Sequence, residues 1–69
     1  MIEELDTVAL LVDRAEAGLE KGLMGAVVSV HGDHEAFEVE FVDDEGHTFG
    51  LETFKPDELL KLHRRAKAA

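Results

Sequence analysis

The chain has 69 residues and no cysteine, so it forms one small domain and excludes a disulfide framework, a thiolate zinc site and a cysteine nucleophile. It carries 16 acidic and 7 basic residues, a formal net charge of −9, and 45% of its residues are apolar, which is typical of a folded chain. A core of this size has no room for a large cofactor, and we expect no cofactor.

No targeting or membrane-spanning segment is evident. The first apolar run, residues 8–12, is flanked by acidic residues, whereas a signal peptide begins with basic ones. No stretch approaches the roughly 20 apolar residues that cross a bilayer. We therefore expect a cytoplasmic protein.

The charge is unevenly distributed along the chain. Residues 1–60 hold all 16 acids and only three bases, whereas residues 61–69 hold four bases and no acid. Because residues 1–60 are strongly acidic, they repel the phosphate backbone of nucleic acids, and we do not expect nucleic acid as a partner. The acidic charge either keeps a small protein soluble or steers a basic protein partner toward it.

The centre of the chain predicts three strands joined by tight turns. In residues 35–43, apolar side chains alternate with Glu38 and Glu40, which is typical of a half-buried strand. A second strand covers residues 26–30, and Gly32-Asp33 between the two strands indicates a hairpin. Residues 43–46 predict another turn, and a third strand follows over residues 47–54, with Phe49, Leu51 and Thr53 on one face. We expect all four phenylalanines to lie in the core: Phe37, Phe41, Phe49 and Phe54.

The two ends of the chain are ambiguous. Apolar residues in 1–20 recur at helical spacing, but a first strand at about residues 6–12 would cover an exposed sheet edge, with a long loop then reaching Gly25. Residues 56–63 fit either a helix that starts at Pro56 or one helical turn and a short strand near residues 60–63. We place the domain at residues 1–63 and expect residues 64–69 to be a frayed basic tail.

Several segments together resemble a known bacterial family. They are Asp6-Thr7-Val8-Ala9-Leu10, then Lys21-Gly22 through Gly25 to Val27-Val28, then residues 37–43, Gly46 and residues 58–60. The combination resembles the family called domain of unknown function 4926 over roughly residues 5–62. The resemblance implies an all-β fold, a small five-stranded SH3-like barrel with a long loop after the first strand and a short helical turn before the last. It also hints at an antitoxin or immunity role.

Candidate chemistry is sparse. Gly22 and Gly25 frame the start of a strand and Gly46 sits in a turn, so we interpret these three glycines as structural. His31 and His34 flank a turn, but their spacing matches no metal motif, and we expect no metal site. Acid catalysis needs a carboxyl group buried in a cleft, whereas the predicted strands direct their glutamates toward solvent, so we expect no catalytic residue.

These observations favour a non-enzymatic acidic module that binds and occludes a basic partner protein, in an antitoxin-like, immunity-like or accessory role. The candidate partner-binding residues lie on the predicted strands and the acidic turn: Glu38, Glu40, Asp43, Asp44, Glu45 and Glu52. Three alternatives remain: an accessory subunit of a larger enzyme, a KOW-like nucleic-acid module using Arg64, Arg65 and Lys67, and a homo-oligomer formed through edge strands.

Overall fold

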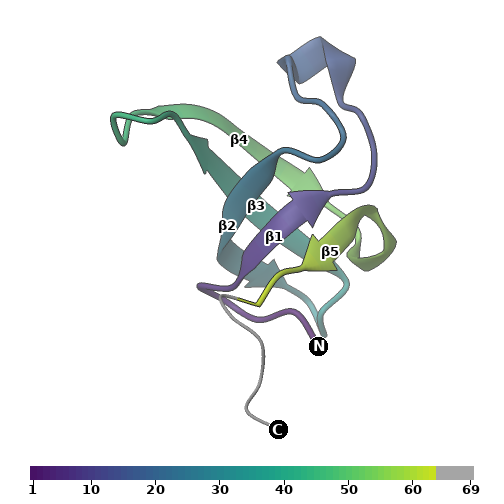
Figure 1. Ribbon diagram of the computed structural model, residues 1–69. Helices are drawn as coiled ribbons and strands as arrows, with labels where there is room; N and C mark the ends of the chain where they lie inside the picture. The colour runs from purple at the N-terminus through teal and green to yellow at the C-terminus, as the bar shows by residue number, and fades with distance from the viewer. Residues whose placement is uncertain (64–69) are drawn as a thin grey trace, which may run out of the picture.

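The computed structural model describes residues 1–63 as one antiparallel sheet of five strands with two 3-10 turns (Figure 1). The strands are β1 (Thr7–Leu10), β2 (Met24–His31), β3 (Ala36–Val42), β4 (Thr48–Phe54) and β5 (Leu59–Lys61). Their order across the sheet is β4-β3-β2-β1-β5. The predicted all-β class is confirmed, and this order is compatible with the SH3-like barrel that the resemblance implies.

The three central strands form as predicted, with β3 confirming the two-residue alternation. Phe37, Val39 and Phe41 are buried, while Glu38 and Glu40 between them are half-buried and face the other way. This separation defines an inner face, which carries the core, and an outer face. The core consists of one cluster of buried apolar side chains: Val8, Leu10, Leu19, Val27, Phe37, Val39, Phe41, Phe54 and Leu59.

The prediction that all four phenylalanines are buried is wrong for Phe49, which is 51% exposed. Phe41 pairs with Gly50, but the next residue, Val42, pairs with Thr48, so the ladder shifts register at Phe49. Such a bulge leaves one residue without a partner and redirects the chain. Gly50 occupies the inner-face position opposite Phe41, and Phe49 lies outside the regular pairing with its ring 6.4 Å from that of Phe41.

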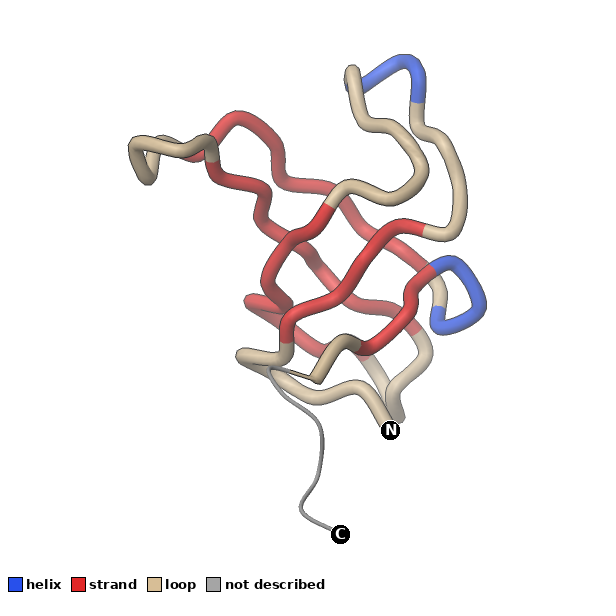
Figure 2. The backbone as a smooth tube through the Cα atoms, in the orientation of Figure 1, coloured by secondary structure: helices blue, strands red, loops and turns tan. Residues whose placement is uncertain are grey.

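The N-terminal segment adopts a strand rather than the helix that its spacing also allowed. β1 pairs with β2 on one side and β5 on the other, as a strand inserted to cover an edge would do. The expected long loop follows over residues 11–23 and contains the 3-10 turn η1 (Ala15–Ala17), seen in blue at the top of Figure 2. Leu19 from this loop is fully buried, so the loop contributes to the core.

The C-terminal segment follows the second of its two predicted alternatives, a helical turn and a short strand. The turn is η2 (Pro56–Glu58), and β5 begins directly after it, one residue earlier than predicted. The expected frayed tail at residues 64–69 lies outside the described residues. In the described part of the chain, no helix has the length and apolar character that crossing a membrane requires.

Candidate protein-binding face

The outer face of the sheet carries two of the predicted binding residues side by side. Glu38 pairs with Thr53 and Glu40 pairs with Leu51, so both carboxylates project from the outer face, on the strand next to the β4 edge. Glu40 accepts a hydrogen bond of 2.8 Å from the Thr48 hydroxyl, which fixes the direction of its carboxylate. Within residues 1–63, neither glutamate pairs with a basic side chain.

The predicted acidic turn lies at the end of the β3–β4 hairpin, adjoining the same face. One carboxylate oxygen of Asp43 accepts the backbone N–H groups of Glu45 and His47, both at 2.9 Å, so Asp43 has a structural role in shaping the turn. Asp44 and Glu45 are exposed. Asp43, Glu45 and His47 also place potential ligand atoms within 4.8 Å of one another, but all three are exposed and the turn itself accounts for their proximity.

Glu52 does not join the other predicted binding residues. It pairs with Val39, which places it on the inner side of β4, where its carboxylate lies 3.8 Å from the Arg14 guanidinium. The alternation that puts Glu38 and Glu40 outward puts Glu52 on the opposite face. The acidic strand face therefore consists of Glu38 and Glu40, and the acidic surface continues from them into the turn at residues 43–45.

Arg14 is a residue whose role the sequence did not indicate. Its guanidinium lies over the Phe54 ring, 4.4 Å from the centroid, and donates a 3.3 Å hydrogen bond to the carbonyl of Thr53. It also lies within 4 Å of the carboxylates of Glu16, Glu52 and Glu58. Arg14 thus ties the long loop to β4 and η2. The only signal in the sequence is that it is the sole base in residues 1–20.

Apolar side chains complete the outer face beside the carboxylates. Ala9 on β1 pairs with Met24 on β2 and with Leu60 on β5, so the three residues form one row across three strands. Met24 is 61% exposed and Leu60 is 51% exposed. An open groove of about 320 Å³ runs over β1, β2 and β3, and Glu40 is one of its lining residues. It is lined by Thr7, Met24, Gly25, Ala26, Glu40 and Val42. An exposed apolar groove bordered by charges is typical of an interaction site.

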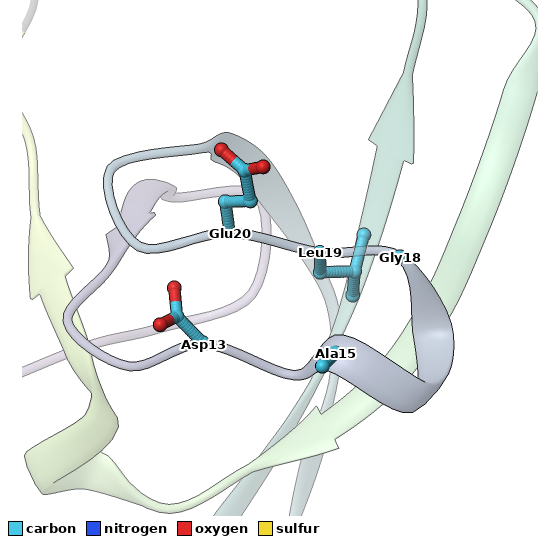
Figure 3. A pocket seen from close by; sticks show the side chains of 5 residues that line it. All are labelled: Asp13, Ala15, Gly18, Leu19 and Glu20. Atoms are coloured by element: carbon cyan, nitrogen blue, oxygen red, sulfur yellow. The ribbon is translucent and has the colours of Figure 1, made fainter.

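A larger and open pocket of about 520 Å³ lies in the long loop (Figure 3). Its carboxylates come from Asp13 and Glu20, which stand on the two arms of the loop. Asp13 accepts the backbone N–H of Lys21 at 2.7 Å, so it holds the two arms together. The remaining lining residues, Ala15, Gly18 and Leu19, offer no nucleophile or base.

The two histidines considered as metal ligands do not converge. His31 pairs with Ala36 at the end of β2, whereas His34 lies in the turn and its Nε2 is 3.0 Å from the Glu3 carboxylate. The hydrogen bond to Glu3 raises the pKa of His34 above its usual 6.5, with a further contribution from Asp33. This pair anchors the N-terminal segment to the β2–β3 turn.

A second contact anchors the same N-terminal segment. The Asp6 carboxylate accepts the backbone N–H of Glu3 at 2.8 Å and lies 3.3 Å from the Lys61 ammonium group. The hydrogen bond from the Glu3 backbone, together with Lys61, lowers the pKa of Asp6 below its usual range, although burial acts in the opposite direction. Lys61 is thereby occupied away from the outer face.

The three predicted structural glycines occupy positions that a side chain would disturb. Gly22 and Gly46 have φ values of 94° and 84°, a region that residues with a Cβ rarely adopt. Gly25 has ordinary extended backbone, but a Cβ built on it would lie 2.6 Å from Val39 Cγ1 and 2.9 Å from the carbonyl oxygen of Glu40. Its role is therefore the close approach of β2 to β3.

These features define a small acidic β domain whose outer sheet face carries both carboxylates and exposed apolar side chains. The chain belongs to the family called domain of unknown function 4926, whose family model matches residues 4–61. Comparisons with curated proteins and with solved structures found no match.

Proposed function

We propose that the domain is a non-enzymatic acidic interaction module that binds a basic partner protein and occludes part of its surface. The observation that carries the proposal is the pairing of an exposed apolar groove with two adjacent carboxylates, Glu38 and Glu40, on the outer face. Apolar contacts would supply the affinity, and the carboxylates would select a partner with a basic surface.

The distribution of the basic residues supports this proposal. Arg14 contacts carboxylates on the loop, β4 and η2, and Lys61 contacts Asp6, so both bases act in holding the fold together. The acidic charge of the outer face is left uncompensated within residues 1–63. Such a surface attracts a basic partner over a distance of about one Debye length, roughly 8 Å at physiological salt.

Occlusion requires no chemistry from the domain, because the partner is covered and is not a substrate. An antitoxin-like, immunity-like or accessory protein would act in this way, by covering a surface of its partner. A cytoplasmic location would suit such a role.

The proposal is tested by affinity capture from a lysate of the native host at low salt. The test variant is Glu38→Lys/Glu40→Lys/Asp44→Lys, and the control is Glu4→Lys/Glu20→Lys/Asp57→Lys, which changes the net charge equally at exposed positions elsewhere. We expect the wild type and the control to retain one stoichiometric protein that high salt releases, and the test variant to lose it. Equal capture by all three proteins, or no capture by the wild type, would contradict the proposal.

A further inference from the structure

Strand β4 is an open edge of the sheet. The order β4-β3-β2-β1-β5 leaves β4 and β5 at the two edges, and β4 has seven residues where β5 has three. Figure 1 shows the β3–β4 hairpin extending beyond the other strands. A long exposed edge presents a row of backbone donors and acceptors that another strand can pair with.

The backbone of β4 shows which residues face outward at this edge. Arg14 donates to the carbonyl of Thr53, so that carbonyl points away from β3. The N–H and C=O of a strand residue point to the same side, and the side alternates along the strand. Leu51, two residues earlier, therefore also directs its N–H and C=O away from β3. In the part of the chain that the structure describes, no loop or side chain bonds to them.

The side chains of β4 make this edge receptive. Phe49 and Leu51 are about half exposed, and no lysine or proline interrupts the strand. Natural proteins usually protect a long apolar edge with such residues. In β4, the first protected position is Thr53, whose carbonyl oxygen accepts a hydrogen bond from Arg14. Lys55 and Pro56 follow after the strand. Because a β-bulge also interrupts an edge, the register shift at Phe49 leaves residues 50–52, centred on Leu51, as the unprotected stretch.

We propose that this edge accepts an extended segment of the basic partner protein as an added strand next to β4. The inference rests on the proposed function and specifies how the partner binds. The backbone of the segment would pair with Leu51. Because side chains alternate between the two faces of a strand, its lysines or arginines would lie on the face of Glu40, which pairs with Leu51, about two strand spacings or roughly 10 Å away, and its apolar side chains would point to the opposite face.

Charge favours a basic segment over the β4 strand of a second copy. Each chain carries a net charge of −9, and an antiparallel pair of β4 strands would bring two acidic domains together. The acidic turn at residues 43–45 leads directly into β4, so a basic strand that pairs with β4 passes beside it. A homodimer formed through β4 is therefore an outcome that would count against the proposal.

The test compares two labelled synthetic peptides in which lysine alternates with valine or threonine. The second peptide has the same side chains, but its alternate backbone amides are N-methylated and cannot donate. We expect the first peptide to bind at low salt, measured by fluorescence anisotropy, and N-methylation to weaken binding by about tenfold or more, as loss of backbone hydrogen bonds implies. Binding should also shift the amide NMR signals of Leu51 and Thr53.

Two variants of the protein refine the test. Leu51→Pro removes the outward N–H, which a sheet edge tolerates, and should weaken binding of the first peptide as N-methylation does. Leu51→Thr keeps that N–H and should weaken binding less. If Leu51→Pro does not fold, the N-methylated peptide still decides the question.

Three results would overturn strand addition: equal binding of the two peptides, no binding of either, or a homodimer in light scattering that strengthens with salt. The affinity capture from the host lysate tests the proposed function independently of strand addition. A partner captured through Glu38 and Glu40, combined with equal binding of the two peptides, would leave the proposed function standing and remove strand addition.

Discussion

The substitution Gly25→Ala examines how closely β2 and β3 approach each other. The added Cβ would lie 2.6 Å from Val39 Cγ1, 2.8 Å from Phe41 Cε1 and 2.9 Å from the Glu40 carbonyl oxygen. Nonbonded carbon atoms prefer about 3.5–4.0 Å. Val39 and Phe41 are fully buried and cannot move into solvent, and the Glu40 carbonyl belongs to the backbone of β3. The two strands must therefore separate.

Overpacking of this kind costs about 1–3 kcal/mol, and the contact with backbone places Gly25→Ala near the upper end. We expect the free energy of unfolding to fall by about 3 kcal/mol. For a domain of this size that is a large part of a total of roughly 4–10 kcal/mol, and it corresponds to a decrease in Tm of about 12–24 °C.

The measurement is urea unfolding followed by far-UV circular dichroism, because the chain has no Trp or Tyr for intrinsic fluorescence. The matched control is Gly50→Ala on β4. There the nearest atom to the new Cβ is the terminal Cδ2 of Leu19 at 3.3 Å, so a small side-chain movement suffices and we expect a loss below about 1 kcal/mol. A loss below about 1 kcal/mol for Gly25→Ala, or equal losses for both variants, would refute the reasoning.

Two further predictions concern the polar contacts that anchor the loop and the N-terminal segment. Arg14→Met removes the guanidinium that lies over Phe54 and beside Glu58, so the free energy of unfolding should fall by about 1–2 kcal/mol, with a smaller loss at high salt. Unchanged urea midpoints at low salt would contradict this. Because the pKa of His34 is raised above 6.5, its pairing with Glu3 stabilises the fold below about pH 6.5 and ceases to do so as the pH rises through the raised value. Glu3→Gln should bring the pKa of His34 back toward 6.5 in an NMR titration, whereas Glu4→Gln should leave it unchanged; a His34 pKa that does not respond to Glu3→Gln would show that the contact is absent in solution.

The sequence predicted the parts of the fold that depend on local patterns. The alternation around Val39 and the glycine at residue 46 each specify one conformation over a short stretch, and both predictions are confirmed. Residues 1–20 could not be assigned in the same way, because their apolar spacing fits a helix as well as a strand. The choice of a strand comes from pairing with β2 and β5, which are distant in sequence.

The face that β4 turns to the core could not be predicted from its own residues. Alternation places Phe49 and Phe54 on opposite faces, and only the pairing of Phe54 with Phe37 shows which of the two faces is buried, while the register shift at Phe41 and Val42 takes Phe49 out of the regular ladder. A bulge has no reliable local signature, because it results from the fit between two strands. The same limit applies to Glu52, whose separation from Glu38 and Glu40 becomes visible only with the pairing.

The candidate site also combines residues that local patterns predict with residues that only the strand pairing brings together. Alternation was enough to place Glu38 and Glu40 together, but it could not show that apolar residues lie beside them, because an apolar residue in a strand is ordinarily expected in the core. Met24 and Leu60 belong to strands far apart in the sequence and share a row only through β1. An outer face with apolar side chains buries apolar surface when a partner covers it, which adds binding energy that the carboxylates alone do not provide. The groove therefore gives the acidic module a source of affinity, and the charges give it selectivity.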